Sequence, residues 1–304
     1  MIITKKIFKT LLKEINSSDP SQRKRKFSTK YVLKQVLYVL QSGIPWSMLT
    51  NLKCHPSTII KRHNKWASLN IFEKLYNNSV QQYGVQCLQK DPLHFKNIFI
   101  DCSMIKSKEA IKECTGYNHY DRFRKATKLS CIVDKECVPI SSVFYPANIS
   151  DLTTLEGTLN NIQCQLTNDK RFHTNVIADK GYVCGEEMRR KMFKRKMNLV
   201  HETRVYKNKV VNVIEKIPTI NKNGAPRKKR ITKKPKALPK TDPGKKRKFT
   251  KAQREALAKR TVIEHLFCRL DKFPRLHFRS DKLLSVFSSF HYIALALLVL
   301  QKLN

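Results

Sequence analysis

Two short apolar runs, each ending on an aspartate, constrain the fold of this chain more than any other feature. Residues 176–178 run into Asp179 and then into a glycine turn, and residues 97–100 run into Asp101. Short runs rich in β-branched or aromatic residues and bounded by a turn are typical of buried strands. We therefore expect each aspartate to lie where a strand ends, with rigid backbone behind it and solvent in front.

An aspartate in such a place has two explanations. Taken alone, Asp179 is readily explained as a turn residue or as the N-cap of the next helix. A carboxylate held at the end of a strand also suits a metal ion. The rest of the chain has to decide between the two.

The charge of the chain points to a polyanionic partner. The sequence holds 61 Lys and Arg against 23 Asp and Glu, a formal net charge of +38 over 304 residues. Such an excess is not typical of a soluble metabolic enzyme, and it favours nucleic acid as the partner. An anionic membrane surface is the alternative.

The nine cysteines predict free thiols rather than a metal ribbon or a disulfide framework. No two of them form a Cys-x-x-Cys pair, so a zinc ribbon is not expected. We expect reduced cysteines packed as small hydrophobes.

Residues 283–301 carry no Asp, Glu, Lys or Arg and approach the length of a membrane span. Serines and His291 interrupt the segment, and Lys282 and Lys302 bracket it closely. We expect a buried helix packed on a sheet, and no membrane partner. The stretch 7–15 is amphipathic and carries lysines, unlike the core of a signal peptide.

The first 90 residues are expected to be helical. Apolar spacing predicts helices over 31–40, 59–69 and 71–83, with Gly43 ending the first and Pro45 opening a short turn. The exposed side of the helix over 59–69 is expected to carry Lys61, Arg62, His63 and Lys65. Helix, tight turn and basic helix are typical of a helix-turn-helix-like DNA-binding domain, here residues 1–90. An ordinary helical bundle with solvated lysines is the alternative.

The pattern changes near residue 94 to a mixed α/β arrangement, which we take as a second domain over 94–304. The expected strands are 97–101, 128–134, 138–145, 176–178 and 198–201, and the expected helices are 150–165 and 185–196.

Between about 206 and 250 the sequence loses periodicity and becomes rich in lysine and proline. Asp242 is the only acid between Lys216 and Arg254. Its basic clusters include Arg227, Lys228, Lys229, Arg230, Lys245, Lys246 and Arg247. We expect a mobile or partly extended insertion that meets phosphates; a solvated loop or a localisation signal is the alternative.

A helical pattern resumes at about Thr250 and is expected to run unbroken through 252–270. It directs Leu257, Thr261, Ile263, Leu266, Phe267 and Leu270 toward a core. Glu264 lies beside this stripe, where it would be partly desolvated unless a cation compensates it. The alternative is a routine helical ion pair with Arg260 or Lys259.

Three carboxylates thus stand out: Asp101, Asp179 and Glu264. Converging from two strand ends and a helix, they can hold two Mg²⁺ ions about 3.5–4 Å apart, a geometry suited to in-line displacement at a phosphodiester. Hard oxygen ligands fit Mg²⁺ or Mn²⁺, and the lack of Cys/His spacing disfavours zinc.

The segments around these acids resemble the three catalytic blocks of insertion-sequence DDE transposases. They are residues 99–103, 178–182 and 260–264, the last with Phe267 and Arg275 beyond it. The closest group is the fifth-numbered insertion-sequence family, within the fourth/fifth superfamily. Further similar positions are residues 43–46, Arg62, Trp66, Lys128, Asp134, Pro139 and residues 148–151. The resemblance covers roughly residues 28–303.

The resemblance implies an RNase H-like catalytic domain in a transposase that cuts at terminal inverted repeats and joins the released 3′-hydroxyls to target DNA. It implies that Asp101, Asp179 and Glu264 form the metal-binding triad. The chain departs from a related Tyr-x-x-Arg-x-x-x-Glu pattern at Leu257, which stands where the tyrosine would be. Asp271 stands where the following lysine is expected, and Lys272 comes one place late.

The expected partner is double-stranded DNA, bound by a homo-oligomer, most simply a dimer. The expected DNA contacts are Lys61, Arg62, Lys65, Lys128, Lys180, Arg227, Lys228, Lys229, Arg230, Lys245, Lys246, Arg247 and Arg260. The expected location is with the DNA: cytoplasm or nucleoid in a prokaryote, nucleus or viral factory in a eukaryotic host. The alternatives are an inactive transposase-derived DNA-binding protein, a nuclease without strand transfer, and a basic RNA-binding protein that uses only the insertion.

Overall fold

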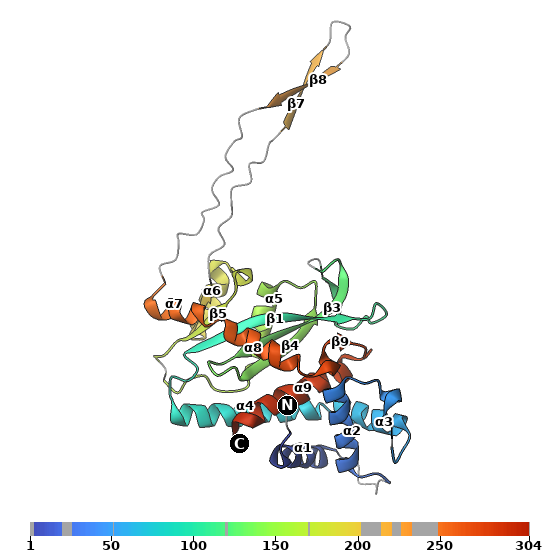
Figure 1. The fold of residues 1–304 in the computed structure, drawn as a ribbon. Coiled ribbons are helices and arrows are strands. Elements are labelled where there is room, and N and C mark those ends of the chain that lie inside the picture. Colours follow the sequence, from blue (N-terminus) through green and yellow to red (C-terminus); the bar gives the residue numbers. More distant parts are fainter. Residues whose placement is uncertain are drawn as a thin grey trace.

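A mixed seven-stranded sheet forms the centre of the protein (Figure 1). The computed structural model describes residues 3–19, 26–50, 52–118, 121–169, 171–201 and 249–303, and the backbone of 214–220 and 226–232. The main strands are β1 (Asn97–Ser107), β3 (Arg124–Val133), β4 (Pro139–Pro146), β5 (Thr174–Ala178) and β6 (Met197–His201). Two short strands, β2 (Gly116–Asn118) and β9 (Phe278–Arg279), extend its edges.

The strand order is that of an RNase H-like sheet. β4 pairs with β3 and β3 with β1, all antiparallel, whereas β1–β5 and β5–β6 are parallel. The two antiparallel steps need only short connections, while the two parallel steps need helical crossovers. These crossovers include α5 (Asp151–Asn160) and α6 (Glu186–Lys194). The mixed α/β prediction is confirmed.

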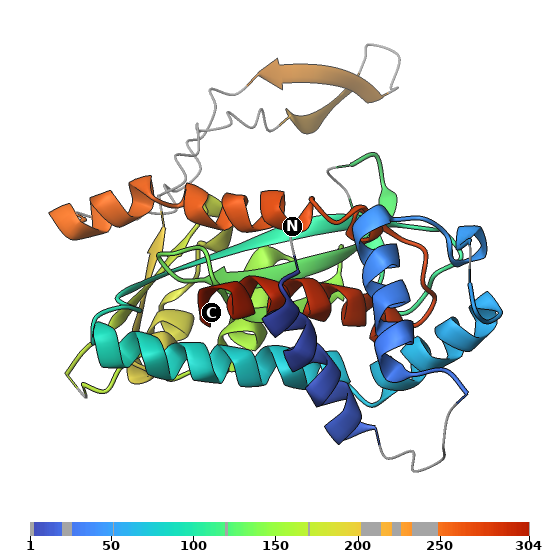
Figure 2. The same cartoon turned by 60° about the horizontal axis from the view of Figure 1, so that its bottom comes forward.

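Helices cover both faces of the sheet. On one face, Thr158 of α5 donates to Ser130 of β3 over 2.8 Å. On the other face, Phe144 of β4 packs edge-on against Phe287 of α9 (Leu284–Leu303), with ring centroids 5.6 Å apart. Alongside α9 runs α4 (Ile71–Lys90), which Figure 2 shows parallel to it below the sheet.

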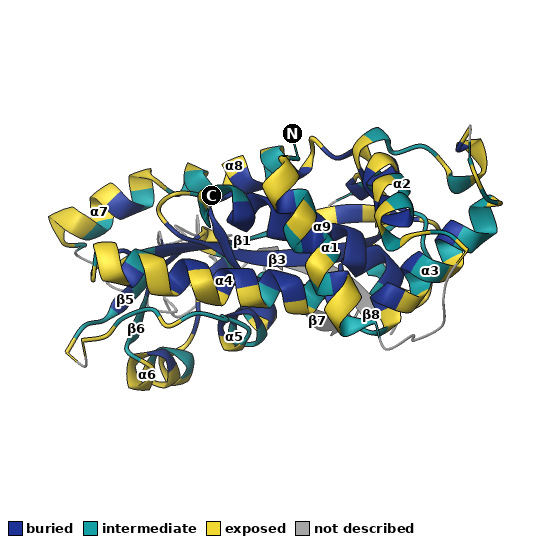
Figure 3. Ribbon diagram, turned by 90° about the horizontal axis from the view of Figure 1, so that it is seen from below, coloured by how far each residue is buried: buried dark blue, intermediate teal, exposed yellow. Residues whose placement is uncertain are grey.

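The C-terminal helix α9 is a core element, as the sequence predicts. Every residue from Val286 to Leu300 is buried, and Figure 3 shows the helix as a dark band between outer helices with exposed faces. It is the one helix in the described ranges that is long and apolar enough to cross a membrane, yet 78% of its most apolar window is buried in this fold.

The N-terminal helices form where the apolar spacing predicts them. They are α1 (Lys5–Ser18), α2 (Thr29–Ser42), the short turn η1 (Trp46–Met48) and α3 (Pro56–Ser68). Ser28 caps α2 by accepting the amide hydrogen of Tyr31, and Gly43 ends it in the left-handed region with φ 70°. A Cβ on Gly43 would also lie 2.7 Å from Cβ of Pro274, so glycine is required there twice over.

One continuous apolar core joins these helices to the sheet. It includes Ile7 of α1, Trp66 of α3, Phe99 of β1 and Leu297 of α9. The division into residues 1–90 and 94–304 stays a prediction.

Strand β1 is longer than expected, and this corrects the placement of Asp101. The apolar run stops at Ile100, but the ladder with β3 continues as far as Lys106, opposite Ala126. Asp101 therefore lies in the middle of a strand, opposite Cys131, and not at its end. Pairing with β3, rather than hydrophobicity, decides where β1 stops. Helix α5, by contrast, is shorter than expected: it ends at Asn160, five residues before the expected end.

The helix expected over 252–270 is broken in two. α7 spans Lys251–Ala258 and α8 spans Thr261–Leu270. At the junction the amide of Ile263 donates to Arg260 O over 3.2 Å, a tightened turn between the two helices. α7 then packs on β5 and β6, and α8 on β1 and β3. The predicted core position of Thr261 is wrong, because this residue is exposed.

Part of the lysine-rich insertion is extended. β7 (Ile214–Ile220) and β8 (Pro226–Thr232) pair antiparallel, and Arg227 to Arg230 belong to β8. Lys245, Lys246 and Arg247 lie outside the described residues.

His63 is buried, contrary to the prediction that it lies on the exposed side of its helix. Its ring packs 4.5 Å from that of Phe290, and its Nε2 lies 3.0 Å from Ser289 Oγ. Burial, with a smaller contribution from Arg275, lowers the pKa of His63 from 6.5 to about 3. The imidazole is therefore a neutral core group that joins α3 to α9.

Acidification is expected to destabilise the protein through His63. The lowered pKa means that only the unfolded chain takes up this proton between pH 6.5 and 3, so stability falls with pH in that window. Between pH 8 and pH 5, His63 alone should cost about 2 kcal/mol of unfolding free energy. Urea unfolding of the His63→Gln variant should show a decrease in unfolding free energy between pH 8 and pH 5 that is smaller by this amount. The exposed His265→Gln is the control, and an unchanged pH dependence in His63→Gln would contradict the assignment.

Candidate active site

Asp101 lies on the central strand of the sheet, half-buried, with β5 on one side and β3 on the other. Its Oδ1 accepts the amide hydrogen of Cys102 at 2.8 Å, which fixes the carboxylate against the backbone. The register of β1 with β5 pairs Phe99 with Ile177. Continued by two residues, that register brings Asp101 level with Asp179.

Asp179 directly follows β5, as the sequence predicts. Its backbone caps a single turn, η2 (Lys180–Tyr182), through the bond from Tyr182 N to Asp179 O at 3.0 Å. Its side chain makes no capping hydrogen bond and is exposed. The turn-residue explanation therefore accounts for the backbone of Asp179 but leaves its carboxylate available.

Arg260 joins the other two acids. Its Nη1 lies 3.2 Å from Asp101 Oδ2, and its Nη2 lies 3.1 Å from Glu264 Oε1. One guanidinium thus spans a carboxylate of β1 and a carboxylate of α8. The side chain of Glu264 is 50% exposed, so about half of it is shielded from water. The helical ion pair with Arg260 is what forms, and it extends to Asp101.

Negative charge accumulates around Asp101. The pKa of its carboxyl is raised to about 6, mainly by burial, with smaller contributions from the charges of Asp179 and Asp151. The hydrogen bond from Cys102 and the charge of Arg260 act in the opposite direction. A carboxyl with a raised pKa among other acids is a feature of functional sites.

Asp151 is a fourth acid at this place, which the sequence analysis does not single out as a site residue. It opens α5 behind the N-cap Ser150, and its Oδ1 lies 2.5 Å from Lys128 Nζ. A Cβ placed on Gly181 would lie 3.5 Å from Asp151 Oδ2, so the acid stands against the turn after Asp179. In the sequence, Asp151 can be recognised as an acid at the start of a helix, directly after a serine that can cap it.

Several basic residues predicted to meet DNA have partners inside the protein. Lys128 is buried and also donates to Ile149 O. Arg62 donates to Phe27 O at 2.7 Å and lies over the Trp66 ring. Lys65 lies 3.3 Å from Asp19. Lys61 and Lys180 are exposed. The DNA contacts of all these residues stay predictions.

The donor set suits a hard cation, although the acids do not form a finished metal site. No group of three His, Cys, Asp or Glu side chains within the described ranges is placed so as to hold a metal ion. The groups around Asp101 are carboxylates, the ligand type that Mg²⁺ and Mn²⁺ prefer. Asp101 and Glu264 already share one cation, the guanidinium of Arg260.

The fold defines the class of protein: an RNase H-like sheet with helices on both faces, one acid on its central strand β1 and another directly after the neighbouring strand β5. A family model described as "Transposase DDE domain" matches residues 95–299, more than half of the chain. The chain belongs to this family and is a transposase by that membership.

Two solved structures are similar at low identity. One is a piggyBac transposase synaptic complex with hairpin DNA, with a TM-score of 0.46, 9% identity and coverage of 97% of this chain and 71% of that chain. The other is a Mos1 transposase paired-end complex with the left transposon end, with a TM-score of 0.24, 11% identity and coverage of 60% and 62%. A comparison with curated protein sequences finds no significant match.

The Arg260 bridge generates a stability prediction. Arg260→Gln removes the cation that faces the half-buried Asp101, and at pH 8 in EDTA this should cost about 2 kcal/mol of unfolding free energy. Because the pKa of Asp101 is about 6, the carboxyl is protonated at pH 4.5 and the cost should shrink there. Urea unfolding at the two pH values measures the difference.

The matched control is Arg190→Gln, which removes an exposed helical ion pair with Glu186. This change should leave the stability unaltered. An Arg260→Gln cost that is equal at pH 8 and pH 4.5 would rule out Asp101 as the partner that matters.

Proposed function

We propose that this chain is an active transposase of the fifth-numbered insertion-sequence family, which binds the terminal inverted repeats of its element, cuts there and joins the 3′-hydroxyls to target DNA. The observation that carries the proposal is the convergence of Asp101 and Glu264 on one cation, with Asp179 level with Asp101. Asp101 belongs to β1, Asp179 directly follows β5 and Glu264 belongs to α8.

Asp101, Asp179 and Glu264 are the residues proposed to hold two Mg²⁺ ions, with Mn²⁺ as an alternative. When bound, such ions activate the attacking oxygen and stabilise the leaving oxygen of the phosphodiester. The chain itself positions the groups: Cys102 orients the carboxylate of Asp101, and Lys128 holds Asp151 behind the turn. The guanidinium of Arg260 lies between Asp101 and Glu264 and donates a hydrogen bond to each of them. A positive charge therefore already lies between these two acids.

DNA binding is supported by the net charge of +38. The proposed surface includes the exposed Lys61 of α3, Lys180 beside Asp179, and the basic strand β8. Residues 1–90 are proposed to bind the inverted repeats as a helix-turn-helix-like unit, and residues 94–304 to carry the catalytic site. A homodimer would hold the two ends of one element, and the protein would act wherever that DNA lies in the cell.

Removing any one of the three acids should abolish cutting. Asp101→Asn, Asp179→Asn and Glu264→Gln are each expected to lower the Mg²⁺-dependent nicking rate at least about 100-fold, while binding of the same DNA persists. The assay uses a supercoiled plasmid that carries the inverted repeats found beside the gene.

The control is Glu187→Gln, which changes an exposed acid on α6 that lies 3.5 Å from Lys191. This variant should cut at the wild-type rate. A wild type that binds these ends but never nicks them would instead support the alternative, a catalytically inactive DNA-binding protein.

The affinity for duplex DNA should depend steeply on salt. If six or more phosphates are neutralised, affinity should fall by about 10³-fold or more between 50 and 200 mM salt, measured by fluorescence anisotropy. Lys61→Ala should lower the slope of log affinity against log salt by about 1. Lys302→Ala, which removes a pair with Glu136, is the control and should keep the wild-type slope. A salt-independent affinity would argue against phosphate binding.

A further inference from the structure

The backbone pairing of β5 with β1 stops before Asp179 is reached. The ladder between the two strands ends with the pair Phe99 and Ile177, two residues short of the acid. The side chain of Asp179 makes no capping hydrogen bond to the turn η2 that follows it. Strand pairing therefore does not by itself set the distance between the Asp101 and Asp179 carboxylates.

Tyr182, the last residue of η2, makes a connection to β1 beyond the end of the ladder. Its amide donates to Asp179 O over 3.0 Å, and its side chain is fully buried. At the far end of that side chain, the phenol oxygen lies 3.2 Å from Cys102 Sγ on β1. One residue thus holds the backbone of Asp179 with its amide and contacts the central strand with its hydroxyl.

Cys102 directly follows Asp101 on the strand. Its amide donates to Asp101 Oδ1 over 2.8 Å. Successive side chains of a strand point to opposite faces of a sheet, so the thiol faces α5 while the carboxylate faces Arg260 near α8. A continuous path therefore joins the two acids: from Asp101 to the Cys102 amide, from the Cys102 thiol to Tyr182, and from the Tyr182 amide to Asp179.

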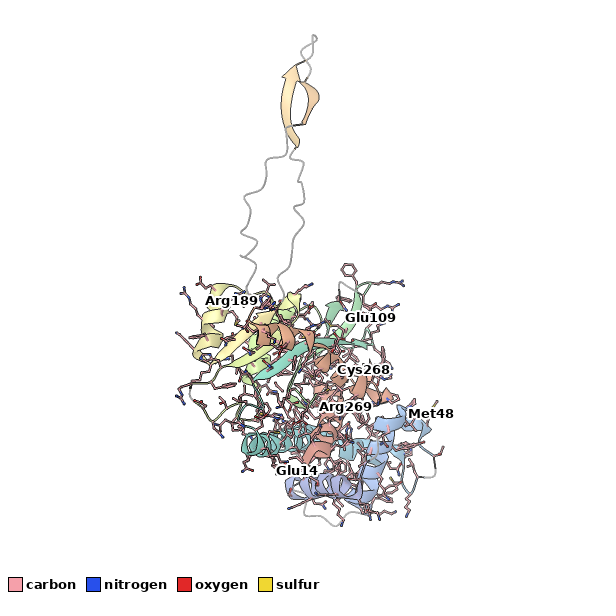
Figure 4. The ribbon with its side chains drawn as sticks, turned by 60° about the vertical axis from the view of Figure 1, so that its left-hand side comes forward. Glu14, Met48, Glu109, Arg189, Cys268 and Arg269 are labelled. Carbon is pink, nitrogen blue, oxygen red and sulfur yellow. The ribbon has the colours of Figure 1, made fainter. Side chains whose placement is uncertain are left out.

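Helix α5 contacts the same thiol from a third side. Cys102 Sγ lies 3.7 Å from Oγ1 of the buried Thr154, which in turn donates to Asp151 O over 2.7 Å. The thiol thus lies where β1, η2 and α5 meet, and each of these elements carries or adjoins one of the clustered acids. The N-terminal helices lie elsewhere: Figure 4 shows Arg189, on the helix that follows η2, and Glu14 of α1 at opposite ends of the folded body.

Polar contacts of this kind restrict movement more than apolar packing does. A hydrogen bond depends on both distance and direction, whereas the hydrophobic effect has no preferred direction. Carboxylates that hold a metal ion are usually kept in place by such partners. Loss of one partner typically lowers metal affinity or activity by about 10- to 100-fold.

We propose that Tyr182 and Cys102 are positioning residues of the candidate site: their contact sets the distance between the Asp101 and Asp179 carboxylates, and so the fit of a divalent cation between them. The inference rests on the proposed function and adds a determinant of metal affinity to it. Neither side chain touches the cation or the DNA in this role. Each residue acts through the acid to which its own amide is bonded.

The test measures Mn²⁺ binding by the full-length protein without DNA, from the electron paramagnetic resonance signal of the free ion. The Asp101→Asn variant defines binding elsewhere on the chain. Tyr182→Phe keeps the buried ring, removes only the hydroxyl, and should raise the dissociation constant for Mn²⁺ about tenfold. Cys102→Ala should have an effect of similar size. The double variant should bind no more weakly than either single variant, because both changes break the same contact.

Tyr83→Phe is the matched control. It removes another buried phenol hydroxyl, which donates to Asp134 Oδ2 over 2.6 Å from α4, on the other face of the sheet. Loss of either hydroxyl should lower the midpoint of thermal unfolding. The Mn²⁺ dissociation constant of Tyr83→Phe should nevertheless stay within about twofold of the wild-type value, because the site is distant. A purely structural role of Tyr182 would change only the unfolding temperature.

Three results would overturn the inference: wild-type Mn²⁺ affinity in Tyr182→Phe, an equal loss of affinity in Tyr83→Phe, or additive losses in the double variant. Wild-type nicking with unaltered Mn²⁺ affinity in Tyr182→Phe would reject the positioning role alone. A wild type that binds Mn²⁺ but neither binds nor nicks plasmid carrying the inverted repeats would reject the proposed function, while the variants would still decide the role of Tyr182. A wild type that binds no Mn²⁺ above the Asp101→Asn background would reject both.

Discussion

The bridge that Arg260 makes between Asp101 and Glu264 is the interaction on which the candidate site depends. It ties the central strand of the sheet to α8 across 159 positions of sequence. Burial and, to a smaller extent, the charges of Asp179 and Asp151 raise the pKa of Asp101, while the charge of Arg260 acts in the opposite direction. The acids can be grouped because a positive group stands among them.

The large positive charge of the chain is used in two different ways. Some basic side chains are structural: Lys128 holds Asp151, Arg62 lies over Trp66, and the buried Arg279 donates to Thr127 over 2.7 Å. Others, such as Lys61 and Lys180, are exposed. Composition alone does not separate the two groups. A net charge of +38 predicts a polyanionic partner, but not which cations face it.

The acids of the candidate site stand out in the sequence, but their surroundings in the fold do not. The apolar run before Asp179 marks the end of a strand, since β5 stops at Ala178. The equivalent run before Asp101 ends in mid-strand, because backbone pairing with β3 continues through polar residues. Glu264 was expected to be partly desolvated, and its side chain is 50% exposed and paired with Arg260. Asp151 contacts a residue of another element of the fold, and so does Tyr182. Local sequence patterns do not predict such contacts.

The sequence by itself determined the local elements: the capped helix ending at Gly43, the strand before Asp179, and the apolar helix α9. These depend on periodicity, caps and turn residues, which act over a few neighbours. Only the tertiary structure decided that β1 continues past Asp101, that His63 enters the core, and that Arg260 lies between two acids. Those outcomes depend on strand pairing, burial and electrostatic compensation between residues far apart in the chain, and short-range pattern carries no information about such partners.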